Sequence, residues 1–169
     1  MTAVTATQVT TQVYRVYIRA TPQAVWDAIT KPEWTRRYGY RGASEYDLRP
    51  GGSYRGLATP EMIAMGGPEV VVDGEVVEAD PPRKLVQTWR FLWDPALVAE
   101  GFTRVTWEIE EDDGGVTRLT VIHELEGAPK TAAMVEPTSP ARLHEGGGGW
   151  AWILSDLKTL LETGKAIAE

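Results

Sequence analysis

The sequence predicts an α+β protein in which a long C-terminal helix covers an antiparallel sheet. Between residues 9 and 125, short stretches alternate apolar and polar residues and are separated by turn-forming residues, which is the pattern of half-buried strands. The segment 142–164 differs, because its second half carries apolar residues at three- and four-residue spacing. A sheet with one apolar face needs a cover, and this helix is the one long element available.

The C-terminal helix is amphipathic in the sequence. Gly164 stands where a left-handed C-cap residue belongs. The run Gly146–Gly149 has two interpretations. The helix begins near Gly149 or Trp150 and the glycines form a hinge, or it begins near residue 140 and needs bare backbone where a ligand or partner approaches. We assign to its apolar face Trp150, Ile153, Leu154, Leu157, Leu160 and Leu161, and to its polar face Ser155, Asp156, Lys158, Thr159 and Glu162.

The rest of the chain reads as one strand, two short helices and a run of further strands. Thr21-Pro22 predicts a helix start after the first strand, 12–19, and Lys31-Pro32 ends that helix and begins a second short one. The short connections between consecutive strands predict an antiparallel sheet of about six or seven strands with one solvent-exposed face. We expect the further strands at 44–49, 53–57, 69–79, 84–93, 102–111 and 116–125, and no regular structure at 58–68, 94–101 and 126–140.

The composition of the chain limits the classes of function and partner that we expect. The 169 residues fit a single domain, with residues 1–11 expected to be flexible and without signal-peptide features. A net charge of −7 argues against nucleic acid or an anionic membrane as partner. The absence of cysteine excludes disulfides and thiolate catalysis and favours a cytoplasmic location. No apolar run reaches the ~18 residues that a membrane span needs.

Several stretches together resemble the START-related (SRPBCC) superfamily, which has the Bet v 1-like helix-grip fold. Within it, the chain is most similar to bacterial members of the branch named after the activator of heat-shock-protein-90 ATPase. The resemblance extends from about residue 13 to 164. It rests on Ala20-Thr21-Pro22 with Val25-Trp26, Asp47 to Gly52, Val72 to Val76, Asp80 to Leu85 with Thr88-Trp89, Thr117 to Thr120, and Gly149-Trp150 with Leu154, Leu157 and Leu161.

The resemblance implies a curved sheet gripping the last helix, with a largely apolar cavity between them. It implies no single chemistry and no cofactor. Members bind lipids, hormones or natural products, and some cyclise or dehydrate polyketides, so the function has to be argued from the cavity. The chaperone-activator role is not expected here, because it depends on a further N-terminal domain of the eukaryotic proteins.

Aromatic residues are the candidates for the cavity wall. The chain has seven Trp and six Tyr but two Phe, and such amphipathic rings are common in binding sites and in cores alike. The alternation of side chains along the predicted strands places several of these aromatic residues on the concave face of the sheet. The alternative is that the rings pack against one another and leave no space. The expected ligand-binding residues are Trp34, Tyr38, Tyr46, Tyr54, Gln87, Trp89, Phe91, Trp107, His123 and Trp150.

His123 is the one candidate for acid–base chemistry, since it shares an inward face with Leu119, Val121 and Leu125. A lone inward histidine is more often a satisfied core residue. A metal site is not expected, because the chain has two histidines and no cysteine. His144-Glu145 is not a metalloprotease motif, since a glycine stands four residues after His144.

Three functions follow from these observations. The first is a small-molecule binding protein that holds a hydrophobic compound, of an aromatic or polyketide-like kind, in the cavity. The second is a cofactor-independent cyclase, dehydratase or hydrolase that uses His123 in the same cavity. The third is a protein-interaction or chaperone-associated module, for which a homodimer is one form.

Overall fold

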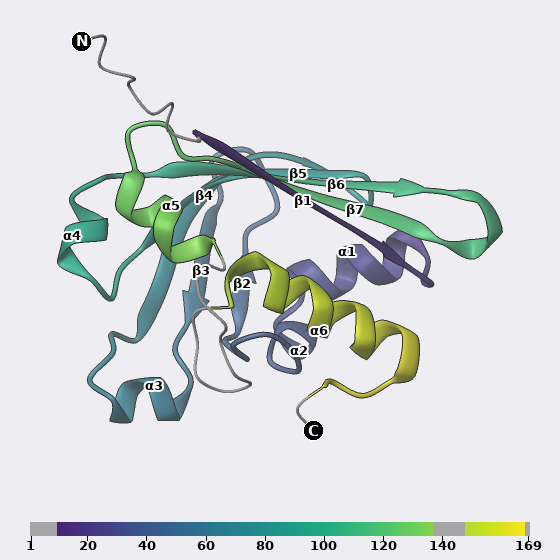
Figure 1. Cartoon of the computed structure of the whole chain (residues 1–169), viewed down its shortest axis with the longest axis horizontal. Helices are drawn as coiled ribbons and strands as arrows, with labels where there is room; N and C mark the ends of the chain where they lie inside the picture. The colour runs from purple at the N-terminus through teal and green to yellow at the C-terminus, as the bar shows by residue number, and fades with distance from the viewer. Residues whose placement is uncertain (1–9, 137–147, 168–169) are drawn as a thin grey trace, which may run out of the picture.

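The computed structural model describes residues 10–136 and 148–167, and its centre is a seven-stranded antiparallel sheet (Figure 1). The order across the sheet is β1-β7-β6-β5-β4-β3-β2. This confirms the predicted α+β class and the helix-grip fold. The strands are β1 (Thr11–Ile18), β2 (Ser44–Tyr46), β3 (Ser53–Leu57), β4 (Val70–Asp80), β5 (Lys84–Phe91), β6 (Thr103–Glu111) and β7 (Thr117–Glu124).

The pairing register aligns the apolar phases of neighbouring strands. Trp107 of β6 lies opposite Leu85 of β5 and Val121 of β7, and all three are buried. Because side chains alternate between the two faces of a strand, this register places one continuous apolar face on the inner side of the sheet. The structure therefore confirms which side chains of β5, β6 and β7 face inward.

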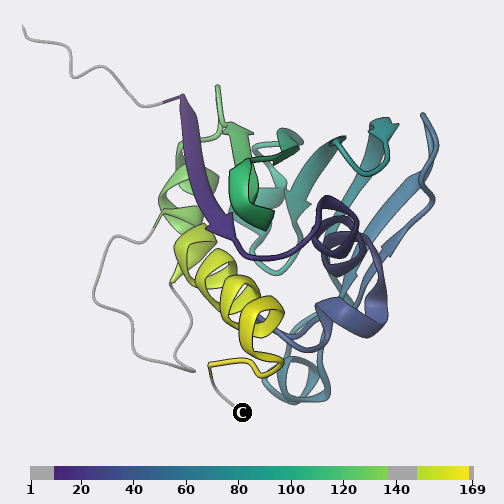
Figure 2. The same cartoon turned by 90° about the vertical axis from the view of Figure 1, so that its right-hand side faces the viewer.

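The two short helices after the first strand are also confirmed. Helix α1 (Pro22–Thr30) begins where predicted, with the Thr21 hydroxyl accepting a hydrogen bond from the Ala24 N–H, and α2 (Pro32–Thr35) follows directly. Helix α6 (Gly149–Thr163) crosses the inner side of the sheet (Figures 1 and 2). It buries Leu154, Leu157 and Leu160 there and ends at Gly164, whose φ is +82°.

The structure decides between the two interpretations of the glycine run. Helix α6 begins at Gly149, whose φ is +57°, and a Cβ there would lie 2.1 Å from the Val135 carbonyl oxygen. The bare backbone at Gly149 thus allows a close approach to the end of α5. Gly146 and Gly147, like His144 and Glu145, lie outside the described residues.

The prediction that three connections have no regular structure is wrong. Helix α3 (Pro60–Ala64), α4 (Pro95–Val98) and α5 (Pro129–Val135) occupy them. The first two follow the same signal that predicts α1, an N-cap side chain before proline: Thr59 accepts from the Met62 N–H and Asp94 from the Ala96 N–H. The predicted strand 44–49 is also shorter, since β2 ends at Tyr46.

Helix α5 receives its N-terminal cap from a distant loop. Ala128, at its N-cap position, makes no side-chain hydrogen bond to the helix. The Glu100 carboxylate instead accepts from the Lys130 N–H (2.9 Å), the Thr131 N–H (2.8 Å) and the Thr131 hydroxyl (2.8 Å). Burial pushes the pKa of Glu100 upward, but these hydrogen bonds outweigh it and lower the pKa.

Asp156 lies in the core, so its assignment to the polar face of the helix is wrong. Its side chain is fully buried, and its two carboxylate oxygens accept from the Gly39 N–H (2.8 Å) and the Ile167 N–H (2.7 Å). A buried carboxylate is tolerated when backbone donors satisfy it. Asp156 thereby ties α6 to the loop after α2 and to the C-terminal segment.

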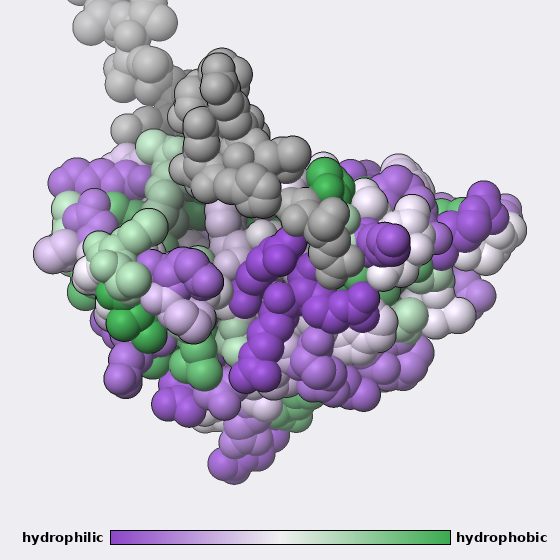
Figure 3. All heavy atoms as spheres, turned by 90° about the horizontal axis from the view of Figure 1, so that it is seen from below, coloured by the Kyte–Doolittle hydropathy of each residue, from purple (hydrophilic) through white to green (hydrophobic). Residues whose placement is uncertain are grey.

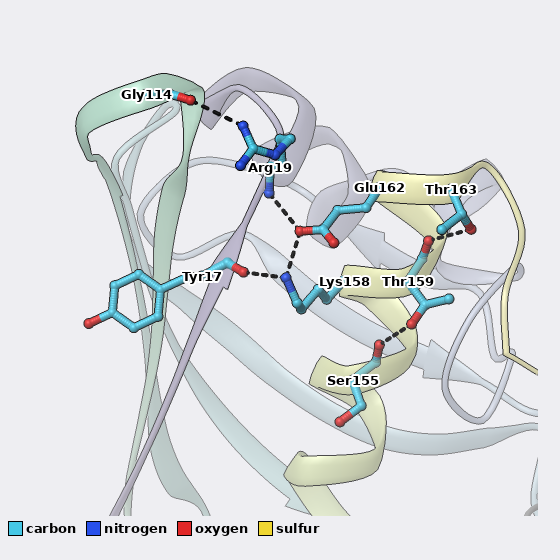
Figure 4. A network of polar contacts seen from close by, with 8 residues as sticks. All are labelled: Tyr17, Arg19, Gly114, Ser155, Lys158, Thr159, Glu162 and Thr163. Atoms are coloured by element: carbon cyan, nitrogen blue, oxygen red, sulfur yellow. Dashed lines mark hydrogen bonds and ion pairs between the residues drawn. The ribbon is translucent and has the colours of Figure 1, made fainter.

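A polar network fixes the C-terminal half of α6 to β1 (Figure 4). The Lys158 ammonium donates to the Tyr17 carbonyl oxygen (2.7 Å) and to the Glu162 carboxylate (2.6 Å). The same carboxylate oxygen accepts from the Arg19 N–H (2.9 Å), and the Arg19 guanidinium reaches the Gly114 carbonyl oxygen (3.4 Å). The helix end is therefore held by Tyr17 of β1 and by Arg19 just after it, and Arg19 in turn contacts the turn before β7.

Candidate functional site

Seven of the ten predicted site residues lie together between the sheet and the start of α6. Gln87, on β5, is the polar centre of one part of this group. Its side-chain oxygen accepts from the Tyr46 hydroxyl (2.7 Å) and from the Trp107 indole N–H (3.0 Å), and the rings of Tyr46 and Tyr54 stack at 4.6 Å. We call the group the aromatic network: Tyr46, Tyr54, Gln87, Trp89, Trp107, His123 and Trp150.

Ring contacts connect the rest of the aromatic network. Trp150, in the first turn of α6, lies edge-to-face against Trp107 (ring centroids 5.4 Å apart) and His123 (5.9 Å). His123 in turn lies edge-to-face against Trp89 (5.2 Å). These are the geometries that aromatic pairs prefer, and they join β5, β6 and β7 to the helix. Sheet and helix therefore meet here mainly through rings.

The hydrogen-bond partners of His123 fix its tautomer. The Trp150 indole N–H can only donate, and it points at His123 Nδ1 (3.1 Å), so Nδ1 is the unprotonated nitrogen. Nε2 then carries the proton and donates to the Thr103 hydroxyl (2.7 Å), which donates onward to the Trp89 carbonyl oxygen (3.0 Å). Both ring nitrogens of His123 and the hydroxyl of Thr103 are therefore hydrogen-bonded within the protein.

Burial sets the protonation states of the network. The side chain of His123 is fully buried, and burial lowers its pKa to about 4, so the ring is neutral near pH 7. Burial also raises the pKa of Tyr54 to about 12 and that of Tyr46 well above its usual value. A neutral histidine whose lone pair already accepts an indole N–H is poorly placed to take a proton from a substrate.

The other three predicted residues lie beside the network. Tyr38 is buried, and its hydroxyl donates to the Ala28 carbonyl oxygen (2.8 Å), which holds α1 to the segment after α2. Trp34 is half-buried on α2, with the Arg37 guanidinium 5.1 Å from its ring centroid. Phe91 is half-buried at the end of β5 and packs against the core.

Thr103 is the member of the site that the sequence reasoning missed. It is buried and bridges His123 to the backbone of β5. The sequence does carry a signal, because Thr103 lies two residues before Val105 and therefore on the predicted inward phase of β6. A small polar residue in an apolar phase is a sign of such a buried bond.

The aromatic network lines neither of two hollows found on the described part of the molecule. One, of about 600 Å³, lies by the start of α1 and the β4–β5 turn and is lined by residues such as Pro22, Arg83 and Glu110. The other, of about 320 Å³, lies beside α2 and α3.

No helix among the described residues is long and apolar enough to cross a membrane, and no three metal-ligating side chains gather in that part of the chain.

Comparison with known families identifies the chain's relatives. The model of the family described as "Activator of Hsp90 ATPase homolog 1-like protein" matches residues 19–162. The chain belongs to this family. No curated protein matches it significantly.

Solved structures support the fold. DynU16, a putative protein of the dynemicin biosynthetic locus, matches 94% of this chain at 23% identity and a TM-score of 0.66, and the chain spans 49% of its length. CalU16 of Micromonospora echinospora matches 93% of this chain at 20% identity (TM-score 0.62, 68% of its length). The Aha1 dimer of Colwellia psychrerythraea matches 94% at 17% identity (TM-score 0.62, 100% of its length).

Proposed function

We propose that the protein binds a hydrophobic small molecule, of an aromatic or polyketide-like kind, between the inner face of the sheet and the start of α6. The observation that carries the proposal is the aromatic network, in which rings from three strands and the helix converge at one place. Binding pockets are typically lined by apolar and aromatic side chains with a few fixed polar groups. In the proposed site, Gln87 and His123 supply the fixed polar groups, since hydrogen bonds hold both side chains in place.

The chemistry of the network favours an apolar ligand. Among the described residues, no buried side-chain nitrogen or oxygen lacks a hydrogen-bond partner. A polar substituent would therefore meet no buried side-chain atom that lacks a partner, whereas an apolar ring would meet ring faces and edges. Half-buried Val72, Phe91 and Ile153 pack against the same core and offer the first contact surface. The presence of the relative DynU16 in a biosynthetic locus is consistent with a natural-product ligand.

Binding is a better proposal than acid–base catalysis by His123. The low pKa of His123 keeps it neutral, and both ring nitrogens are already hydrogen-bonded inside the protein. To act as a base, Nδ1 would have to lose the Trp150 N–H and expose a fully buried ring. The same bonds suit a positioning role, in which His123 fixes the Trp150 ring at the ligand's side.

The test compares two phenylalanines. Native mass spectrometry of the purified protein should reveal a co-purified hydrophobic compound, and the apolar dye Nile red should bind saturably. F91A should weaken Nile red binding at least ~fivefold, since it removes a ring beside the network. F102A is the matched control, because Phe102 is 53% exposed and stacks under Arg90. A clean apo mass together with no dye binding, or equal effects of both variants, would contradict the proposal.

A second copy of the chain is the protein partner that we propose. β1 is an edge strand, and two of its large apolar side chains, Val13 (57%) and Tyr17 (50%), are exposed. Edge strands with apolar side chains tend to pair with another chain unless they are protected. The Colwellia relative was solved as a dimer. Sedimentation equilibrium should show a dimer that V13K weakens, and a monomer at high concentration would reject this partner.

A further inference from the structure

The backbone groups of β1 point alternately toward the sheet and away from it. The Leu125 N–H donates to the Thr10 carbonyl oxygen (2.6 Å), and β1 and β7 run antiparallel from this pair onward. Because the hydrogen bonds of such a ladder recur at every second residue, the even-numbered residues of β1 direct their N–H and C=O groups at β7. The odd-numbered residues direct theirs away from the sheet, since β1 is an edge strand.

Helix α6 covers the C-terminal part of this outward edge, beside which it lies in Figure 2. The Lys158 ammonium donates to the outward carbonyl oxygen of Tyr17 (2.7 Å). Just after the strand, the Arg19 N–H donates to the Glu162 carboxylate (2.9 Å; Figure 4). Charged side chains placed on an edge in this way keep another strand from pairing there.

The N-terminal part of the same edge is open. Within the described part of the chain, no group bonds to the outward N–H and C=O groups of Thr11, Val13 and Arg15. The side chains of all three residues are exposed. A short stretch of backbone donors and acceptors with an apolar side chain at its centre is a template for one more strand.

The outer face of the sheet carries a largely apolar row that ends at Val13. The pairing register places Ile122, Thr106 and Val86 beside it in succession. Val86 is buried and the other two are half-buried, whereas Val13 is 57% exposed. A second Val13 beside the first would continue this row and cover its exposed end. By contrast, hydrophilic side chains dominate the opposite side of the molecule (Figure 3).

The charges beside Val13 fit a second copy of the same strand. When two antiparallel β1 strands are centred on Val13, Arg15 of each copy lies opposite Thr11 of the other. Thr11 is paired with Glu124 of β7, so the guanidinium comes within reach of that carboxylate. The Glu124 side chain is 53% exposed, and its carboxylate lies 3.9 Å from the Arg104 Nε. It can therefore face a second cation as well.

The alternative register, centred on Arg15, is unfavourable. It sets two guanidinium groups directly opposite each other, and like charges in that position destabilise a strand pair. It also needs the outward carbonyl oxygen of Tyr17, which Lys158 already occupies. Arg15 donates one N–H to the Thr120 hydroxyl (3.0 Å) within its own chain, which leaves its other guanidinium N–H groups for a partner. The register centred on Val13 is therefore favoured.

We propose that two copies of the chain pair antiparallel through residues 11–15 of β1, with Val13 opposite Val13, so that their sheets become continuous. This inference rests on the second copy proposed above as partner, and it adds the segment and the register of the contact. About six main-chain hydrogen bonds join the two strands, and the contacts of α6 with the end of β1 limit their length. The interface is small, so we expect dissociation in roughly the micromolar range.

Disulfide cross-linking of single-cysteine variants of the full chain tests the register, because the chain has no cysteine of its own. In this register the two Val13 Cα atoms lie about 5.5 Å apart, within disulfide range, and the two Tyr17 Cα atoms more than ~20 Å apart. V13C should therefore form linked dimers at least ~tenfold faster than Y17C under diamide oxidation. Y17C is the matched control, since Tyr17 is 50% exposed on the same face of β1.

A second pair of variants checks the register independently of Val13. T11C and R15C should link to each other when mixed, because they lie opposite in the proposed pairing, and neither should link efficiently to itself.

A charge reversal tests the electrostatic part of the interface. E124K should weaken the dimer about threefold in sedimentation equilibrium, because it sets a like charge near Arg15 of the other copy. E111K is its control, since Glu111 is an exposed residue at the far end of β6.

The outcomes separate this interface from the partner itself. Y17C or R15C linking to itself as fast as V13C would overturn the register. A dimer that persists while V13C does not link, or that E111K weakens as much as E124K, would overturn this interface and leave a second copy as the partner. A monomer at high concentration would reject both.

Discussion

The two halves of α6 are held by different kinds of interaction. In the C-terminal half, Asp156 accepts two backbone N–H groups, and Lys158 joins Glu162 to the end of β1. In the N-terminal half, the principal contacts with the sheet are those of the Trp150 ring with Trp107 and His123. Directional bonds to backbone fix a helix in one position, whereas ring contacts tolerate small displacements. The looser attachment of the N-terminal half, which has one side-chain hydrogen bond to the sheet, agrees with the ligand site proposed there on the basis of the aromatic network.

The largest effect is expected at Asp156. D156A leaves the partly buried Gly39 and Ile167 N–H groups without their charged acceptor, which should lower the free energy of unfolding by about 3–5 kcal/mol. Urea denaturation measures this, with S155A as the exposed neighbouring control expected to change it by less than about 0.5 kcal/mol. Nile red binding by the folded fraction should stay within a few-fold. A loss below ~1 kcal/mol would remove the contrast between the two halves.

The next effect is a pH dependence from the N-terminal half. The pKa of His123 is about 4 in the fold against 6.5 for the free side chain, so the unfolded chain binds more protons between these values. Stability therefore falls as pH falls through this window, and this residue alone should cost about 2–3 kcal/mol between pH 7 and 4.5. H123Q should show a pH loss smaller by that amount. Parallel curves for the two proteins would show that the ring is charged or exposed in the fold.

A smaller effect tests the bond between helix and sheet. W150F keeps a large ring but removes the indole N–H, which leaves the buried His123 Nδ1 without a donor and should cost about 1–2 kcal/mol. W152F is the control in the same turn of α6, since Trp152 is half-buried. If W152F costs as much as W150F, ring volume and not the hydrogen bond holds the N-terminal half.

The smallest effect is expected at Lys158. Its side chain is 40% exposed and that of Glu162 27% exposed, so solvent screens the ion pair, and K158A should cost about 0.5–1 kcal/mol. Because the loss is electrostatic, it should shrink in about 1 M NaCl, while the loss in D156A should persist. An undiminished K158A effect at high salt would point to packing of the lysine stem.

The sheet could be predicted because its evidence is local. Alternation along β5, β6 and β7 specifies which side chains face inward, and this pattern by itself assigns Gln87, Trp89 and His123 to the interior. Helices α3 and α4 were not predicted, because four or five residues are too few to show helical periodicity. Thr59-Pro60 and Asp94-Pro95 nevertheless carry the signal for a helix start.

The parts that could not be predicted depend on distant partners. Asp156 looks like a surface residue in the helical pattern, and its acceptor role appears only when Gly39, 117 residues away, is brought beside it. The hydrogen bonds of Gln87 and His123 likewise depend on strand register and on where α6 begins. Alternation determines the face of a strand on which a side chain lies, but not the atom that it meets.

The capping of α5 by Glu100 has a consequence for the order of folding. Seven residues are too few to form a stable helix alone, since isolated helices shorter than ~12–15 residues are marginal in water. The cap comes from a carboxylate 30 residues earlier, which reaches the helix only after β6 and β7 have paired. We therefore expect helix α5 to form late in folding. In refolding followed by hydrogen exchange, the Lys130 and Thr131 amides should gain protection after those of the β6–β7 ladder.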